Sequence, residues 1–460
     1  MIMRIKKISV YGLFGLFDHV VPLFTEDRIT IIHAPNGYGK TTILKLIYSL
    51  CKGHDIDILM TDFKRFRLDF EDGSNIQVEK IKNDYPQKKS GGLLKDLNFK
   101  EILKYTYTKA DGEVLEYIPR FNREKLRSFI SQLISPKANN GDAAFKDPDA
   151  IKDLELDEVV NVYSNMFSNL ISGSDDQPEW LAGMRDCIDI IFIESSRLYN
   201  APGNYSARDK TNGPEPIVNV YSEGIMDVMA AKISLYADVS HRLDRAFPAR
   251  LSKNMEMLIK NELKDGDILD TASINCELKE LEVRRSRLIE AGLLENGESD
   301  HVDISEGMQD NARIVLTMYV RDMKEKLSVF DDLEKKIELL KKIINKQFLY
   351  KKMVVSKEKG FIFTLPDGSY LKPDRLSSGE QNELILNYDL LFNSSPGSFI
   401  LIDEPEISLH IMWQQQFIRD LKEISGLADI DILIATHSPH IIDDFWDLTA
   451  ELKGAPDVRV

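Results

Sequence analysis

The sequence predicts an α/β fold that is assembled from an N-terminal and a C-terminal lobe, with a long, mainly helical insertion between them. At the N-terminal end, the β-branched run at 29–33 leads into a glycine-rich turn and then an apolar helix. At the C-terminal end, the apolar runs at 398–402 and 431–436 have the length of buried strands. Between the lobes, residues 225–350 space their apolar side chains as helices do.

Five segments are predicted. They are an N-terminal lobe with the glycine loop at 1–54, a β-rich and then acidic helical insertion at 55–190, a return strand and linker at 191–224, a helical hairpin at 225–350, and a C-terminal lobe at 351–460. Turns at 71–74 and 110–112 separate alternating strands. Residues 141–190 hold three basic and twelve acidic side chains, which indicates either a solvated helical face or a docking surface for a basic partner.

Apolar residues in the predicted hairpin recur at intervals of four and three. One run extends from Leu316 to Phe330, and a second run in a shifted phase extends from Leu333 to Ile344. The stretch at 291–307 interrupts the pattern. We therefore expect an antiparallel, coiled-coil-like hairpin, whose long arm would measure about 60 Å for roughly 40 residues.

Composition excludes several classes of function. The 460 residues carry 59 basic and 75 acidic side chains, a net charge of −16, which argues against a sequence-blind grip on nucleic acid. The three cysteines form no CxxC, so we expect neither a zinc ribbon nor a disulfide framework. No apolar run reaches the roughly 18 residues of a membrane helix, and no signal-peptide cleavage site follows the basic start. We expect a cytoplasmic protein that does not enter a membrane.

The glycine loop at 34–42 follows the phosphate-binding pattern G-x-x-x-x-G-K-[ST], except that Ala34 replaces the first glycine. Glycines let backbone N–H groups curl around phosphate oxygens, and the following helix adds partial positive charge. Lys40 would reach the β- and γ-phosphates, and the Thr41 hydroxyl would bind Mg²⁺. The predicted nucleotide-binding residues are Asn36, Gly37, Gly39, Lys40, Thr41 and Thr42. The alternative is a glycine-rich turn before an ordinary helix.

The apolar run at 398–402 ends in two carboxylates, Asp403 and Glu404. Asp403 is a candidate Mg²⁺ ligand, and Glu404 is a candidate catalytic residue that orients or deprotonates the attacking water. A solvated loop would also place two carboxylates at a strand end.

Two further motifs lie in the C-terminal part. Ser377, Gly379 and Glu380 belong to the sequence LSSGEQ before an apolar helix, which by itself is also typical of a capping box. His437 follows the run at 431–436, where a single histidine is more often structural than catalytic.

These four motifs, in this order and so far apart, resemble those of the ABC-type ATPases with a split head, the group of SMC, RecF and OLD-like proteins. In that family the nucleotide loop lies at one end of the chain, the LSxGE signature and the Walker B strand lie at the other, and a long helical insertion separates them. The resemblance covers about residues 1–50 and 360–445. It implies ATP and Mg²⁺ as cofactors and hydrolysis of ATP to ADP and phosphate.

The resemblance also implies roles for single residues. Lys40 and Thr41 correspond to ligands of the nucleotide and of Mg²⁺, and Asp403 and Glu404 correspond to the Walker B pair. His437 corresponds to the switch histidine that senses the γ-phosphate and takes part in catalysis.

Other implied roles involve a second subunit. Ser377, Gly379 and Glu380 would bind the nucleotide held by a partner copy, so the active site would be composite and the protein would be at least a dimer. The segment 406–410 matches the position of the D-loop. The segment 196–197 lies where relatives carry a Q-loop, although the expected glutamine is absent.

The resemblance narrows further. The break in the hairpin lacks the CxxC of a zinc-hook repair ATPase, and no Toprim nuclease follows His437 as it does in OLD-like proteins, so we expect any effector to be another chain. The segments 7–19, 29–42 and 407–414 are most similar to ATPase subunits of prokaryotic anti-phage defence systems, first the AriA family of PARIS and then the PtuA family of Septu. This implies a scaffold that holds an AriB-like Toprim nuclease and releases it on sensing a phage-encoded trigger protein.

Triggers of this kind are acidic DNA mimics, so a basic pocket is expected. Candidates are Arg284, Arg285 and Arg287 on a helix and Lys88 and Lys89 in a loop, although ordinary surface charge explains each of them better.

Three hypotheses remain open. The first is the defence scaffold, the second is a RecF- or SMC-like repair ATPase that clamps DNA, and the third is an assembly protein in which ATP is only structural. DNA remains a possible partner, but the net charge favours a protein partner. A Glu404→Gln variant separates the third hypothesis, because it would leave that function intact and would trap a closed state in the other two.

Overall fold

The computed structural model describes residues 3–82, 101–119, 177–194, 216–260, 268–295, 309–407 and 409–454. The chain forms two compact units, which we call the sheet unit (1–195 and 394–460) and the helical unit (196–393). Residues 141–176 of the predicted acidic segment lie outside the described residues. The basic candidates at 88–89 and the segment 196–197 at the Q-loop position also lie outside them.

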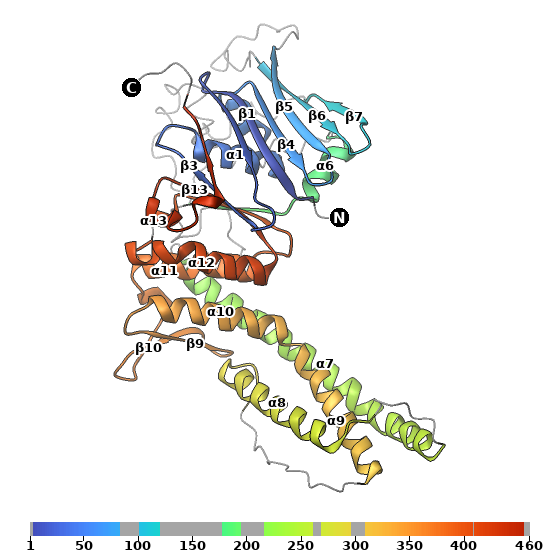
Figure 1. Cartoon of the computed structure of the whole chain (residues 1–460). Coiled ribbons are helices and arrows are strands. Elements are labelled where there is room, and N and C mark those ends of the chain that lie inside the picture. Colours follow the sequence, from blue (N-terminus) through green and yellow to red (C-terminus); the bar gives the residue numbers. More distant parts are fainter. Residues whose placement is uncertain are drawn as a thin grey trace, which may run out of the picture. The chain divides into compact units, whose positions relative to one another are not determined.

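Strands from distant parts of the sequence form one parallel sheet in the sheet unit (Figure 1). Its order is β14 (Thr449–Glu451), β3 (Ile29–His33), β13 (Asp431–Thr436), β12 (Phe399–Asp403) and β8 (Ile190–Ile193). The side chains of β3, β12 and β13 are almost all buried, as parallel strands covered on both faces require. Because the strands are parallel, the segments that follow them emerge at one edge of the sheet.

An antiparallel sheet forms the second layer of the sheet unit. Its order is β2 (Phe17–Pro22), β1 (Ile5–Leu13), β4 (Arg65–Phe70), β5 (Asn75–Lys82), β6 (Glu101–Thr108) and β7 (Val114–Tyr117). The tight connections from β4 to β5 and from β6 to β7 are the two predicted turns, and both contain a glycine at positive φ, Gly73 and Gly112. The predicted α/β class is therefore confirmed.

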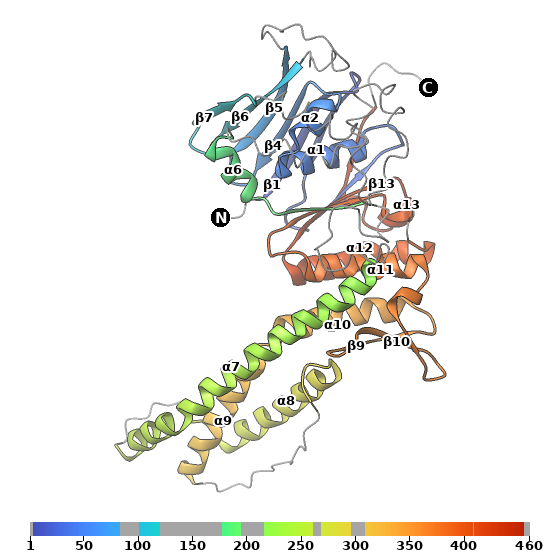
Figure 2. The same cartoon turned by 180° about the vertical axis from the view of Figure 1, so that it is seen from behind.

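Helix α1 (Lys40–Lys52) packs against β8, β12 and β13 (Figure 2). Its apolar side chains, including Ile43 and Ile47, belong to one hydrophobic core that also takes side chains from both sheets. Among the described residues, the other helices of this unit are α2 (Asp55–Met60), α6 (Glu179–Asp186), α12 (Ile411–Ala428) and α13 (Pro439–Ile442), with single turns at Pro405–Ile407 and Trp446–Leu448. This core fixes the start of α1, and with it the glycine loop, relative to the parallel sheet.

The helical unit contains α7 (Ile217–Ile259), α8 (Thr271–Glu290), α9 (Asp310–Ser328), α10 (Asp331–Gln347) and α11 (Ser378–Phe392). A small antiparallel sheet of β9 (Lys352–Ser356), β10 (Gly360–Thr364) and β11 (Tyr370–Leu371), followed by a turn at Pro373–Arg375, belongs to the same unit. Residues 351–393 were predicted to belong to the C-terminal lobe. They join the helices instead, because β9 and α11 pack against α10 and β10 packs against α7.

The predicted coiled-coil-like hairpin is not confirmed. Helix α9 packs against both α7 and α8, so three helices associate where two arms were expected. The shift in apolar phase between Phe330 and Leu333 marks the end of α9 and the start of α10. The longest helix is α7, whose 43 residues extend about 65 Å.

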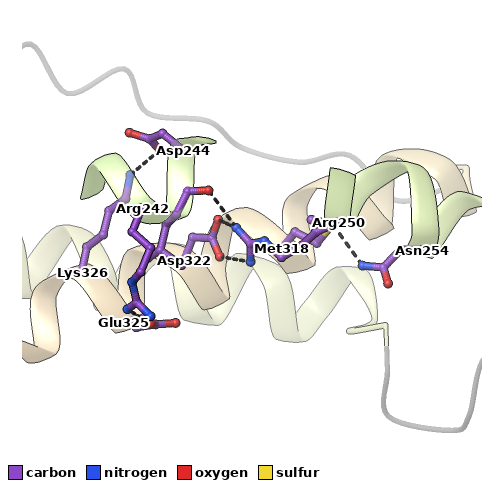
Figure 3. Close-up of polar contacts among 9 residues, drawn as sticks. Arg242, Asp244, Arg250, Asn254, Met318, Asp322, Glu325 and Lys326 are labelled. Carbon is purple, nitrogen blue, oxygen red and sulfur yellow. Dashed lines mark hydrogen bonds and ion pairs between the residues drawn. The ribbon is translucent and has the colours of Figure 1, made fainter. Parts of the chain in front are cut away.

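Polar contacts join α7 to α9 (Figure 3). Arg250 donates to both carboxylate oxygens of Asp322 at 2.7 and 2.6 Å, and it also donates to the carbonyl of Leu243 at 3.1 Å. Pro248 lies inside α7 and lacks the N–H of a helical residue, so the turn before it is weakened. Arg250 therefore links this weakened turn of α7 to the buried carboxylate of α9.

Candidate functional site

Two glycines shape the loop between β3 and α1. Gly37 and Gly39 both have φ of +86°, a left-handed conformation that residues with a Cβ rarely adopt. At Gly39 a Cβ would also lie only 2.4 Å from Cδ2 of the buried Leu13, whereas the space at Gly37 is open. Position 39 therefore requires glycine both for its positive φ and for the close approach of Leu13. Position 37 requires glycine only for its positive φ.

Lys40 is the first residue of α1, and its side chain is buried beneath the loop. Its ammonium group donates to the carbonyls of Ala34 at 2.8 Å and Pro35 at 3.2 Å, and the residue is 4% exposed. Burial lowers the pKa of Lys40, although the nearby carboxylates of Glu404, Glu406 and Asp403 act in the opposite direction. These contacts hold the ammonium group at the closed end of the glycine loop.

The Thr41 hydroxyl donates a hydrogen bond to Asp403 Oδ1 at 3.0 Å. Burial is the main reason why the pKa of Asp403 is raised, and the charge of Glu404 raises it further, against the opposing effect of Thr41. The ionised Asp403 carboxylate would therefore be stabilised by a nearby cation. The two oxygens suit Mg²⁺, which prefers oxygen ligands and completes its coordination with water and phosphate. Such a site needs only one or two protein ligands.

Glu404 follows β12 in a left-handed conformation, with φ of +44°, which costs on the order of 1 kcal/mol for a residue with a side chain. Its backbone N–H donates to the carbonyl of Ala435 in β13 at 2.9 Å. A cavity of about 200 Å³ adjoins it, lined by Phe14, Asn36, Gly37, Gly39, Lys40, Thr41, Thr42 and Glu404. The glycine loop and Glu404 therefore line the same space.

His437 follows β13 at the same edge of the sheet. Its side chain is 45% exposed, and Nδ1 lies 3.1 Å from Glu406 Oε1. The sheet unit thus brings five predicted residues to one edge, namely Lys40, Thr41, Asp403, Glu404 and His437.

The three signature residues lie in the helical unit. Ser377 is the N-cap of α11 and forms a complete capping box with Glu380, as that simpler interpretation of the motif expects. Lys351 Nζ contacts both carboxylate oxygens of Glu380 at 2.6 Å. Burial raises the pKa of Glu380, but the hydrogen bonds from Lys351 and Ser377 outweigh it and hold the pKa below its ordinary value. Gly379 lies in the first turn of α11.

The three arginines expected to form a basic pocket lie on α8. Arg284 donates to the carbonyl of Leu327 at 3.0 Å and contacts the carboxylates of Asp331 and Glu334. Arg284 is therefore paired with carboxylates within the helical unit, and the expected basic pocket stays a prediction.

Sequence reasoning missed the support beneath the glycine loop. The Tyr38 ring stacks on Phe17 of β2 with centroids 5.3 Å apart, and His19 Nε2 lies 3.0 Å from the Tyr38 carbonyl. Burial lowers the pKa of His19, so the ring is neutral and donates from Nε2. The aromatic and histidine residues of β2 were the only signal in the sequence.

Sequence reasoning also missed Glu194 at the edge of the parallel sheet, and it named Glu406 only as part of the segment at the D-loop position. Glu194 directly follows β8, and because Ile193 pairs with Ile402, Glu194 is next in register to Asp403, whose pKa its charge helps to raise. Glu406 lies beneath His437. The strand pattern before 194 and the repeated acidic residues at 403–406 carried this information.

Residues 246–442 match the family model of the AAA ATPase domain. This region includes the signature, Asp403, Glu404 and His437, and it covers less than half of the chain. The match, together with the site in the sheet unit, supports an ATPase. No curated protein matches the chain.

Among solved structures, the chain is similar to the SMC head domain from Thermotoga maritima, with a TM-score of 0.33 and 11% identity over 98% of this chain and 95% of that one. It is also similar to the Smc head domain with an extended coiled coil, bound to the C-terminal domain of ScpA, from Pyrococcus furiosus. That comparison has a TM-score of 0.30 and 13% identity over 96% of this chain and 91% of that one. TM-scores in this range do not establish a common fold. Within the described residues, no helix is both long and apolar enough to cross a membrane.

Proposed function

We propose that the chain binds ATP with Mg²⁺ and hydrolyses it at the edge of the parallel sheet. The observation that carries this proposal is the hydrogen bond from Thr41 to Asp403, because it joins the end of the glycine loop to the end of β12. Mg²⁺ held by these two oxygens would neutralise phosphate charge.

The residues around the Thr41–Asp403 pair would bind the phosphates and activate the attacking water. The backbone N–H groups around Gly37 and Gly39 and the start of α1 would bind the phosphates, and the Lys40 ammonium would contact the terminal ones. Glu404 would orient and deprotonate the attacking water, because it lines the cavity without serving as the Thr41 partner. His437 would contact the γ-phosphate.

The catalytic centre is completed, in our proposal, by the signature of a second copy. Ser377 is exposed at the start of α11, where backbone N–H groups and the helix dipole favour an anion. Ser377, Gly379 and Glu380 of one copy would bind ATP held by another, so that ATP promotes dimer formation.

At the level of the cell, we propose a cytoplasmic ATPase scaffold of an anti-phage defence complex, which holds a separate Toprim-type nuclease and releases it when a phage protein is detected. The resemblance of the segments 7–19, 29–42 and 407–414 to such ATPases supports this role. The net charge of −16 favours a protein partner over DNA.

The first experiment measures ATP binding and phosphate release by the full chain and by Lys40→Ala and Glu404→Gln variants. We expect Lys40→Ala to weaken ATP binding at least about tenfold, as loss of a charge-assisted contact predicts. Glu404→Gln should retain ATP binding and lose phosphate release. Unchanged binding by Lys40→Ala would contradict the proposed site.

The second experiment isolates tagged Glu404→Gln protein, expressed from its native operon, in the presence of ATP. Co-purification of a nuclease-like protein without DNA would support the scaffold. Salt-labile DNA without a partner protein would instead support the DNA clamp.

A further inference from the structure

Glu406 has an unusual set of contacts directly beneath His437. Its Oε1 accepts from the Thr436 hydroxyl at 2.8 Å and from the backbone N–H of His437 at 3.0 Å. His437 Nδ1 lies 3.1 Å from the same oxygen. Oε2 of Glu406 is buried and has no hydrogen-bond partner among the described residues. One carboxylate oxygen therefore contacts both the backbone and the ring of a single histidine.

Glu406 and His437 differ in how firmly they are held. The Glu406 side chain is 8% exposed, whereas the His437 side chain is 45% exposed. Ser438 N–H donates to the Thr436 hydroxyl at 3.0 Å, so the group that donates to Glu406 is itself fixed. The carboxylate is therefore the rigid member of the pair, and the exposed ring takes its orientation from it.

A second link joins the same two segments. Gln414 Nε2 donates to the carbonyls of Glu406 at 3.3 Å and Leu409 at 3.2 Å. The Ser438 hydroxyl donates to Gln414 Oε1 at 3.1 Å. The segment after the Walker B carboxylates and the segment after β13 are thus tied at two points, so that a shift of one displaces the other.

We propose that Glu406 is a positioning residue that fixes the tautomer and the orientation of His437. A carboxylate oxygen beside Nδ1 favours the tautomer with the proton on Nδ1, since two lone pairs at this distance would repel each other. Nε2 is then directed away from Glu406 with a free lone pair.

This inference rests on the proposed function and deepens it. The imidazole would meet the terminal phosphate of ATP through Nε2, in an orientation that Glu406 sets. Glu406 itself would touch neither the nucleotide nor the attacking water.

The test uses NMR of full-length protein whose eight histidines carry ¹⁵N, with His437→Gln to assign the signal. We expect His437 to be protonated at Nδ1 in the unmodified protein. Glu406→Ala should move it toward the Nε2-protonated form. Glu406→Gln should keep the Nδ1 proton, because its amide oxygen can still accept. Glu26→Gln, an exposed carboxylate in the same unit, should change nothing.

Steady-state ATP hydrolysis provides a second readout on the same proteins. Glu406→Ala should lower kcat about tenfold or more with a smaller change in KM, and Glu406→Gln should recover part of that loss. An unchanged tautomer in Glu406→Ala would overturn the proposal, and so would a kcat equal to that of the unmodified protein. If Glu406→Ala fails to fold, Glu406→Gln decides, because without a charged carboxylate it must fall below the unmodified kcat. Failure of the proposed ATPase function can be told apart from failure of the Glu406 proposal. The first would appear as unimpaired ATP binding by Lys40→Ala. The second would appear in the His437 tautomer, which is measured without nucleotide.

Discussion

The hydroxyl of Thr41 and the carboxylate of Asp403 are in hydrogen-bond contact although 362 positions separate them in the sequence. The contact exists because β3, which precedes the glycine loop, and β12, which ends at Asp403, lie on either side of β13 in one parallel sheet. Neither end of the chain can form the oxygen pair alone. The candidate metal site is therefore a product of folding of the whole sheet unit.

Replacing Asp403 by Asn should separate stability from activity. Burial raises the pKa of Asp403, so ionisation of this group lowers the free energy of unfolding as pH rises from the unfolded pKa of about 3.9 through the raised folded pKa. We expect Asp403→Asn to raise the Tm of the nucleotide-free protein at pH 7. Phosphate release should fall at least about a hundredfold, because the amide is a poor Mg²⁺ ligand.

The same thermal scans with and without Mg²⁺ and ATP provide the control. The unmodified protein should gain Tm on adding both, and Asp403→Asn should gain much less. A lower Tm in the nucleotide-free variant, combined with an intact response to Mg²⁺, would contradict the assignment of Asp403.

The two loop glycines offer a matched pair of substitutions. Gly37→Ala introduces a Cβ into open space at φ of +86° and should lower the free energy of unfolding by about 1 kcal/mol. Gly39→Ala has the same φ and also places the Cβ against buried Leu13, so the loss should be about 2–4 kcal/mol. Urea unfolding of both variants measures the difference. Equal losses in the free energy of unfolding would show that the Leu13 side chain moves aside at little cost and does not restrict the loop.

The strands and the site residues of the sheet unit could be predicted because each depends on the composition of a short stretch of sequence. The run at 29–33, the glycine loop and the run ending at Asp403 have the composition of strand, loop and strand, and the structure places them so. The predicted roles of Lys40, Thr41, Asp403 and Glu404 required only that the two segments meet. The parallel sheet brings them together.

The packing of the helical unit could not be predicted in the same way. The run from Leu316 to Ile344 reads as one continuous arm, since a one-residue shift in phase is small in sequence. In the structure the same shift ends α9 and begins α10. Which helices pack together depends on contacts between distant residues, such as Arg250 and Asp322, that no local pattern encodes.

The contact between α7 and α9 should depend on Arg250 far more than on Arg242 (Figure 3). Arg250→Ala leaves the buried carboxylate of Asp322 without its bidentate partner, and we expect a loss of about 1–2 kcal/mol in the free energy of unfolding. Arg242 pairs with Glu325 where both side chains are exposed, so Arg242→Ala should cost no more than about 0.5 kcal/mol.

Chemical denaturation of the two arginine variants at moderate salt distinguishes these cases, because salt screens the fully exposed pair more strongly than the pair made by the buried Asp322 carboxylate. A double variant, Arg250→Ala with Asp322→Asn, should be more stable than Arg250→Ala alone, since it removes the unpaired charge. Equal effects at positions 250 and 242 would mean that the Arg250 contact adds nothing beyond a surface ion pair.

The contact between Lys351 and Glu380 predicts a specific dependence on pH. Burial alone would raise the pKa of Glu380, but Lys351 and Ser377 hold it below the ordinary value. A lowered carboxyl pKa contributes stability that is present above the unfolded value of about 4.3 and is lost as pH falls through the folded value. Lys351→Met should therefore lower the free energy of unfolding at pH 7, and the difference from the unmodified protein should shrink below about pH 4.

Lys352→Met is the matched control, because Lys352 is the exposed neighbour in β9 and no hydrogen bond or ion pair joins its side chain to a described residue. Its difference from the unmodified protein should stay constant between pH 3 and pH 7 when urea midpoints are compared. Parallel curves for Lys351→Met would show that Lys351 does not set the charge state of Glu380. A convergent curve would show that the start of α11 is held by an ionised carboxylate, and that protonation of this one group loosens the signature segment.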